Sequence, residues 1–227
     1  MKNYNIAIDG PAGAGKSTIA KNIAKKLQYI YVDTGAMYRA MALSMMRQGI
    51  STENEEAVSK ACSLIKITIE YIDGLQQVKL NGENVTAFIR DEEVGKNASV
   101  VARYNTVRKK MVELQQSLAS SSNVIMDGRD IGTVVLPSAD LKIFLTASSK
   151  TRAFRRWKEL EEKGILSNID DIEADIINRD RQDMNREISP LRQAEDAVLV
   201  DSSNLTIDEV IDKIILLFKE KCKGDLI

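Results

Sequence analysis

An eight-residue segment near the N-terminus, Gly10 to Ser17 (GPAGAGKS), fits the phosphate-binding pattern G-x-x-x-x-G-K-[ST]. Its glycines let the backbone wrap closely round a phosphate, whose charge is met by backbone N–H groups and a helix N-terminus. Lys16 is suited to neutralise the β- and γ-phosphates, and Ser17 to bind Mg²⁺. The pattern predicts a nucleoside triphosphate site made of Gly10, Pro11, Ala12, Gly13, Ala14, Gly15, Lys16, Ser17 and Thr18.

The elements on either side of this loop are those that such a site requires. A strand-like apolar run covers 4–8, and a helix is expected over 16–27. The apolar residues on one face of that helix are Ile19, Ala20, Ile23, Ala24 and Leu27. Because strand, loop and helix follow one another in this order, a chance glycine-rich turn is rejected.

A second polar segment, Asp127 to Asp130 (DGRD), follows an expected strand over 124–126. At the carboxyl end of a parallel sheet it would lie beside the phosphate loop, where ligands bind in such folds. Asp127 is suited to hold Mg²⁺ through water, Arg129 to meet a phosphate and Asp130 to read the edge of a base. The alternative is an ordinary β-turn with a surface ion pair.

Arginines gather in and near two charged helical stretches, 149–163 and 169–185. The seven-residue spacing of Arg179 and Arg186 predicts that both share one helix face, with Asp183 between them. Arginines on helices are usually solvated, but beside a triphosphate they can stabilise the charge of a transferred phosphoryl group. The arginines concerned are Arg152, Arg155, Arg156, Arg179, Arg181 and Arg186.

The overall composition is that of a soluble globular enzyme, with 44% hydrophobic and 29% charged residues among 227. The net charge of −1 provides no global field for a nucleic-acid polymer or an anionic membrane. Histidine is absent, which excludes Ser-His-Asp and Cys-His catalysis, and two cysteines supply neither a disulfide framework nor a zinc site. No signal peptide or membrane span is seen, so a cytoplasmic location is expected.

Strands and helices alternate along most of the chain. Further apolar strands are expected over 29–32, 141–145 and 198–200, and further helices over 34–49 and after a capping box of Thr206 and Glu209. Five strands with intervening helices predict a doubly wound α/β fold with a parallel sheet. No shift in composition marks a second fold, so one domain, 1–227, is predicted.

The segment 51–90 interrupts this alternation and is predicted to be an insertion. A capping box of Thr52 and Glu55 predicts a helix to Leu64. Alternating runs over 66–72 and 77–80 predict a β-hairpin that turns at Asp73-Gly74. Two helical stretches follow over 91–121, with a break near Tyr104.

Several longer motifs resemble those of the bacterial cytidylate kinases, which belong to the nucleoside monophosphate kinase group. They are IAIDGP at 6–11, DTGAMYR at 33–39, DGRDIGTVV at 127–135, Arg179-Asp180 and SPL at 189–191. These motifs extend along most of the chain, so the resemblance is not confined to the generic phosphate loop.

This resemblance implies a five-stranded parallel core, a nucleoside-monophosphate-binding subdomain at 51–90 and a short mobile lid at about 149–165. It implies ATP as donor, CMP or dCMP as acceptor and Mg²⁺, with transfer expected to be direct and in line. The implied catalytic residues are Lys16, Arg129, Arg152, Arg156 and Arg186. The implied acceptor residues are Ser99, Arg108 and Asp130 at cytosine, Thr34, Tyr38, Arg39, Arg129 and Arg186 round the phosphate, and Arg179 and Asp183 at the ribose.

Without the resemblance, Ser99 and Arg108 would be expected to be surface residues and Tyr38 could be a packed aromatic. Two other functions stay open: a kinase for shikimate or a different nucleotide, and a nucleotide-dependent switch. The guanine-reading motif Asn-Lys-x-Asp is missing, which argues against a GTPase switch. We expect a monomer that acts on small molecules.

Overall fold

The computed structural model describes residues 2–72 and 74–222. The chain divides into two compact units. Unit 1 comprises 1–29 and 122–227, and unit 2 comprises Ile30–Ser121. The predicted insertion, 51–90, lies wholly inside unit 2, and its identity as a substrate subdomain stays a prediction.

A five-stranded sheet has the strand order β2-β6-β1-β7-β8, which confirms the predicted α/β class. The strands are β1 (Asn5–Asp9), β2 (Ile30–Asp33), β6 (Val124–Gly128), β7 (Leu141–Thr146) and β8 (Val198–Asp201). Within unit 1, β1 pairs in parallel with β6 and β7, and β7 with β8. Strands covered on both faces need apolar side chains throughout, and residues 6–8 and 124–126 are almost completely buried.

The register of these strands brings their carboxyl ends to one edge of the sheet. Asp9 lies opposite Gly128 on one side and Phe144 on the other, and Thr146 lies opposite Asp201. The segments that leave this edge are the phosphate loop, residues 129–130 and the start of the helix after β7. The predicted site segments of unit 1 therefore begin side by side.

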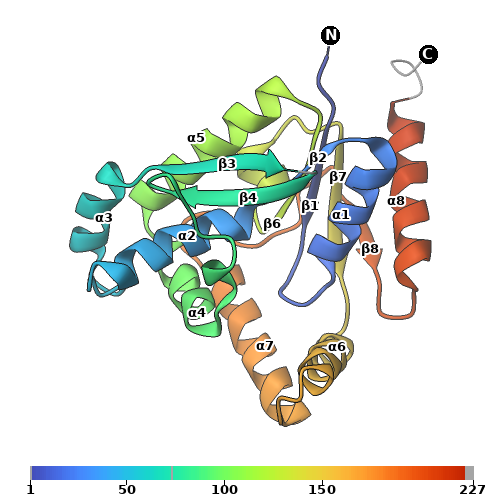
Figure 1. Ribbon diagram of the computed structural model, residues 1–227. Coiled ribbons are helices and arrows are strands. Elements are labelled where there is room, and N and C mark those ends of the chain that lie inside the picture. Colours follow the sequence, from blue (N-terminus) through green and yellow to red (C-terminus); the bar gives the residue numbers. More distant parts are fainter. Residues whose placement is uncertain (1, 73, 223–227) are drawn as a thin grey trace. The chain divides into compact units, whose positions relative to one another are not determined.

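The described part of unit 1 also has four α-helices: α1 (Lys16–Leu27), α6 (Ser149–Glu162), α7 (Ile169–Met184) and α8 (Ile207–Lys221). Helices α1 and α8 lie next to each other, and α6 and α7 form a helical hairpin (Figure 1). The hairpin turns near Gly164, whose positive φ of 71° suits glycine. The predicted capping box of Thr206 and Glu209 is present at α8.

A five-residue π-helical turn, Ile131–Val135, follows β6 and was not predicted. Its first two N–H groups donate to the carboxylate of Asp9, from Ile131 to Oδ1 over 2.8 Å and from Gly132 to Oδ2 over 2.7 Å. The free N–H groups at the start of this turn are thus bonded by a carboxylate 122 positions earlier in the chain. Local sequence patterns do not indicate such a distant contact, so the turn could not be predicted.

Unit 2 has its own hydrophobic core, which includes Met37, Met41, Met45 and Met111. Strands β3 (Ile67–Ile72) and β4 (Leu75–Leu80) pair antiparallel, as predicted, while Asp73 of the predicted turn lies outside the described residues. The two-residue β5 (Glu83–Asn84) and the short turn η1 (Phe88–Arg90) were not predicted. The other elements are α2 (Thr34–Arg47), α3 (Glu55–Leu64), β5 (Glu83–Asn84), η1 (Phe88–Arg90), α4 (Glu92–Val101) and α5 (Asn105–Ser121).

The predicted capping box of Thr52 and Glu55 is wrong. Asn54 caps α3 instead, and its side chain accepts from the N–H of Ala57. Asn54 directly precedes the helix, and asparagine is as good an N-cap as threonine. Thr52 is buried, and its hydroxyl bonds to the side chain of Asn97.

No helix among residues 2–72 and 74–222 is long and apolar enough to cross a membrane.

Candidate active site

The phosphate loop has backbone angles that its glycines make possible. Gly10 has a φ of 151°, and a Cβ there would overlap the carbonyl oxygen of Leu145 on the neighbouring strand. Gly13 has a φ of 75°, and a Cβ there would lie 3.3 Å from Cβ of Arg152. The left-handed region costs a side chain energy, and both positions are also crowded. The loop therefore passes close to β7 and α6.

Lys16, the first residue of α1, turns back over this loop and is 6% exposed. Its ammonium donates to the carbonyl of Pro11 over 2.7 Å. Burial, followed by the charge of Arg129, lowers the pKa of Lys16 to about 7. A phosphate in the loop would add negative charge and so raise this pKa.

Ser17 and Asp127 meet at the end of the loop, where the Ser17 hydroxyl donates to Oδ2 of Asp127 over 2.8 Å. A hydroxyl and a carboxylate are oxygen donors of the kind that Mg²⁺ prefers. Among residues 2–72 and 74–222, no cluster of three or more His, Cys, Asp or Glu side chains could hold a metal. This pair fits a cation that keeps its waters and completes its shell with phosphate oxygens.

Asp9, at the end of β1, is a residue of the site that the sequence did not single out. It is 4% exposed and holds the turn that follows Asp130. Burial raises the pKa of Asp9 to about 6, although the N–H groups of Gly132 and Ile131 oppose the shift. Asp9 therefore connects the strand before the phosphate loop to the turn after Asp130, which is itself 5% exposed.

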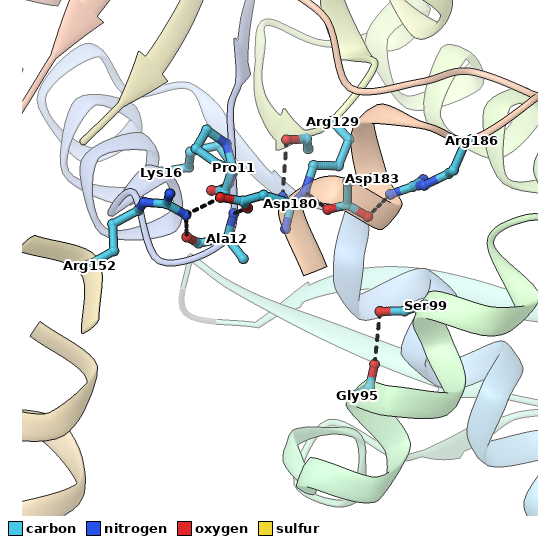
Figure 2. Close-up of polar contacts among 11 residues, drawn as sticks. Pro11, Ala12, Lys16, Gly95, Ser99, Arg129, Arg152, Asp180, Asp183 and Arg186 are labelled. Atoms are coloured by element: carbon cyan, nitrogen blue, oxygen red, sulfur yellow. Dashed lines mark hydrogen bonds and ion pairs between the residues drawn. The ribbon is translucent and has the colours of Figure 1, made fainter. Parts of the chain in front are cut away.

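Three predicted acceptor residues, Arg129, Asp183 and Arg186, form one ionic group (Figure 2). Oδ2 of Asp183 lies 2.6 Å from Nε of Arg129, and Oδ1 pairs with Arg186. Burial alone would raise the pKa of Asp183, but Arg129 and Arg186 outweigh it and the pKa is about 2. Burial would lower the pKa of Arg129, but the Asp183 carboxylate outweighs this effect and holds that pKa above its usual value.

The shared helix face predicted for Arg179 and Arg186 is wrong, because α7 ends at Met184. Arg186 lies in the segment after the helix and reaches back to Asp183 from there. Arg179 is on α7 and exposed. Arg186 thus meets Asp183 because the chain turns back after the end of α7, and not because the two residues share a face of the helix.

The three arginines of α6 have different surroundings. Arg152 is buried and pairs with Asp180 of α7 at 2.7 Å. Arg155 donates to the carbonyl of Ser202 over 2.7 Å. Arg156 is exposed and pairs with Glu159 of its own helix. Of these, Arg156 is the one at the protein surface.

In unit 2 the candidate residues start at the N-terminus of α2, which Asp33 caps through the N–H of Ala36. The side-chain amide of Gln76, on β4, accepts from the N–H of Asp33 over 2.7 Å and donates to its carbonyl over 3.2 Å. Arg90 pairs with the Asp33 carboxylate at 2.9 Å. The start of α2, and with it the buried Thr34, is therefore fixed by two other segments, β4 and η1.

Arg39, on the next turn of α2, donates to the carbonyls of Ile89 and Asp91 over 3.3 and 3.4 Å. A Cβ on Gly95 would lie 2.7 Å from Nη1 of Arg39, so a side chain there would displace this guanidinium from its present position. The hydroxyl of Ser99 bonds to the carbonyl of Gly95 over 3.3 Å (Figure 2).

Arg108 is 3% exposed, so the expectation that it is a surface residue is wrong. It donates to the carbonyl of Ala102 over 3.1 Å, and its guanidinium lies 5.7 Å from the ring centroid of Tyr38. Tyr38 and Arg108, predicted separately at the acceptor phosphate and at cytosine, are thus in contact. A buried arginine stacked on an aromatic ring is held in a defined orientation.

The sheet, with a Lys-Ser phosphate loop at the end of its first strand, defines the class of protein: a P-loop kinase. The fold is shared with a gluconokinase from Sinorhizobium meliloti, which is 14% identical, with a TM-score of 0.52 and coverage of 97% of this chain and 94% of that one.

The family model for cytidylate kinase matches residues 6–220. A cytidylate kinase from Caldicellulosiruptor saccharolyticus is 52% identical over 96% of each chain. One from Desulfitobacterium hafniense is 50% identical over 97% of this chain and 94% of its own. The chain therefore belongs to the cytidylate kinase family, as its motifs suggested, and it is a nucleotide-binding phosphotransferase.

Proposed function

We propose that this chain transfers the γ-phosphoryl group of ATP to CMP or dCMP, giving ADP and CDP or dCDP. The observation that carries the proposal is the phosphate loop, with Lys16 over it and Ser17 bonded to Asp127, in a chain that matches the cytidylate kinase family over 6–220. A phosphate loop alone is compatible with many reactions, and the family match selects one.

On the donor side, residues Gly10 to Thr18 bind the triphosphate of ATP. Lys16 exchanges its bond to Pro11 for phosphate oxygens, and it becomes more basic there because the phosphates are negative. The N–H groups at the start of α1 point their dipoles toward the same anion. The proposed ATP site therefore combines an ammonium group with main-chain N–H dipoles.

Ser17 and, through water, Asp127 would hold Mg²⁺, since their oxygens suit it. The ion supplies charge neutralisation between the β- and γ-phosphates when it is bound. With the ion bound, Ser17 would exchange its bond to Asp127 for a bond to the ion, and Asp127 would hold the ion through water.

The proposed acceptor residues come from both units: Thr34, Tyr38, Arg39, Ser99 and Arg108 from unit 2, and Arg129, Asp130, Arg179, Asp183 and Arg186 from unit 1. Cytosine has a 4-amino donor beside an N3 acceptor. Asp130 accepts from the amino group, while Arg108 and Ser99 donate to the N3 and O2 side. Thr34, Tyr38 and the arginines surround the phosphate, and Arg179 and Asp183 contact the ribose.

Transfer is direct and in line, without a covalent intermediate. Lys16, Arg129, Arg152, Arg156 and Arg186 stabilise the charge that spreads over the moving phosphoryl group. Because little covalent work is needed from the protein, its contribution is positioning and electrostatic field. The segment about 149–165 serves as a lid, 51–90 serves the acceptor, and the enzyme is a cytoplasmic monomer.

The test is a panel of acceptors, CMP, dCMP, UMP, AMP and shikimate, each incubated with ATP and Mg²⁺ while ADP release and the phosphorylated product are measured. CMP and dCMP should react at the highest kcat/KM, and chelation of Mg²⁺ should stop the reaction. Turnover of ATP with no phosphorylated acceptor would support a nucleotide switch instead. Preference for shikimate or AMP would support a different kinase.

A further inference from the structure

The main chain of Ala12, inside the phosphate loop, is held from both sides by charged side chains (Figure 2). The Ala12 N–H donates to Oδ1 of Asp180 over 3.3 Å. The Ala12 carbonyl accepts from Nη1 of Arg152 over 2.8 Å. Arg152 and Asp180 are themselves paired, Nη1 to Oδ2, at 2.7 Å. Three contacts thus close a ring on one residue of the loop.

This ring is buried, since the side chains of Arg152 and Asp180 are 7% and 11% exposed. Away from water, hydrogen bonds to charged groups are strong, and each charge depends on the other for compensation. Loss of either side chain would leave the other charge buried and poorly compensated. The ring therefore holds Ala12 firmly.

Arg152 also fixes the ring to the neighbouring helix. Its Nε donates to the carbonyl of Ala147, which directly follows β7, over 2.9 Å. Its side-chain carbons lie against Gly13, where an added Cβ would be 3.3 Å from Cβ of Arg152. Asp180 belongs to α7, so the phosphate loop is connected to both helices of the α6–α7 hairpin.

The charges of the pair matter for an anionic ligand. A lone carboxylate beside a phosphate loop would repel a triphosphate, and Arg152 cancels that charge. The N–H of Ala12 is directed to Asp180, which leaves the later N–H groups of the loop to meet phosphate. Asp180 thus determines the path of the loop without contributing a ligand group.

We propose that Asp180 is a positioning residue for the nucleoside triphosphate. Together with Arg152, it sets the curvature of the phosphate loop and couples the loop to the α6–α7 hairpin. The identity of the triphosphate as ATP rests on the function proposed above.

The experiment compares Asp180→Ala, Asp180→Asn and wild type by calorimetric binding of ATP without acceptor, by KM for ATP and CMP, and by Tm. Asp180→Ala should raise the Kd for ATP at least ~10-fold while KM for CMP changes less than about 2-fold. Asp180→Asn keeps an oxygen for the Ala12 N–H and should raise the Kd only about 3-fold. The control is Asp175→Asn, an exposed carboxylate on the same helix, which should match wild type.

A charge test separates positioning from a general loss of structure. Arg152→Met leaves the Asp180 carboxylate unneutralised, so ATP should bind at least ~3-fold more weakly than to the double variant Arg152→Met/Asp180→Asn. If the double variant binds ATP no better than Arg152→Met, the proposal is overturned. It is also overturned if Kd for ATP is unchanged in both Asp180 variants, or if KM for ATP and CMP rise equally.

These measurements distinguish a failure of the Asp180 variants to fold from a failure of the proposed function. If Asp180→Ala does not fold, the Kd of Asp180→Asn decides. If wild type binds ATP but does not phosphorylate CMP, the proposed function fails, while the calorimetric comparison still tests Asp180.

Discussion

In unit 1 a buried carboxylate, Asp183, pairs with Arg129 and Arg186, whereas in unit 2 a neutral amide, that of Gln76, holds the start of α2. Asp183 satisfies two guanidiniums with its two oxygens. Gln76 instead satisfies the N–H and the carbonyl of Asp33, as a neighbouring strand would do. Both arrangements fix candidate ligand residues from a distant segment.

The difference has consequences for pH and for mutation. The ion pairs of Asp183 with the two arginines form only while its carboxyl group is ionised, so their contribution to the stability of the fold depends on pH. An amide that bonds to main chain has no charge to lose, and each such bond makes a modest net contribution. The Asp183 group of unit 1 should therefore respond to charge changes, whereas Gln76 of unit 2 should act through hydrogen bonding, beside the ion pair of Arg90 and Asp33.

The largest effect is expected from Lys16→Ala, which removes a charge of unit 1 that acts on the ligand. We expect kcat to fall at least ~100-fold, because the transferred charge loses the cation of the phosphate loop. The fold should persist, since burial already disfavours the charged form of Lys16, whose pKa is about 7. Steady-state kinetics and Tm are the measurements, with the exposed Lys25→Ala as control. An unchanged kcat would contradict the role given to Lys16.

Asp183 should make stability depend on acidic pH. Its pKa falls from 3.8 to about 2 on folding, so its ionised form stabilises the native state above pH 4. That contribution, about 2 kcal/mol, should disappear as the pH falls to about 2. The free energy of unfolding of wild type minus that of Asp183→Asn, from urea titrations, should decrease by this amount between pH 5 and 2. A difference that does not vary with pH would show that the ionic group adds no stability.

Asp130 should discriminate between bases. Uracil presents a 4-oxo acceptor and an N3–H donor where cytosine presents the reverse, so its O4 would face the Asp130 carboxylate. Asp130→Asn, whose amide can donate, should lower the ratio of kcat/KM for CMP over UMP at least ~10-fold, which corresponds to about 1.4 kcal/mol. The measurement uses both acceptors at fixed ATP. A ratio equal to that of wild type would mean that Asp130 does not read the base.

The smallest effect is expected in unit 2. Gln76→Ala removes two hydrogen bonds to Asp33 and should cost about 1 kcal/mol of unfolding free energy. KM for CMP should rise about 3-fold as the start of α2 loosens, while KM for ATP stays constant. Gln77→Ala, on the neighbouring position of β4, is the control. A larger rise of KM for ATP than for CMP would contradict the acceptor role given to the start of α2.

Much of the fold could be predicted because its signals are local. The α1 helix runs from Lys16 to Leu27 as its apolar spacing indicates, and the phosphate loop precedes it. The break between α4 and α5 lies at 102–104, next to the predicted position. Where the apolar periodicity and a motif both indicate the same element, the local sequence preference agrees with the tertiary structure, and the element can be predicted.

The errors and omissions come from contacts between distant segments. The π-helical turn after Asp130 depends on Asp9, and the loop geometry at Ala12 depends on Asp180, 168 positions away. The burial of Arg108 could not be predicted from the sequence, because a helical pattern does not show which distant residues pack against the helix. The prediction for Arg186 failed because periodicity does not show where a helix ends.

The division of unit 1 into two chain segments has a consequence for the order in which the molecule is made. Its first strand is synthesised early, yet its partners β6 and β7 follow only after all of unit 2, and the bond between Tyr4 and Asn123 joins residues 119 positions apart. During translation, the continuous unit 2 can condense first. Until β6 and β7 have been made, β1 has no partner strand and its apolar side chains stay exposed, which makes the unfinished chain prone to aggregation.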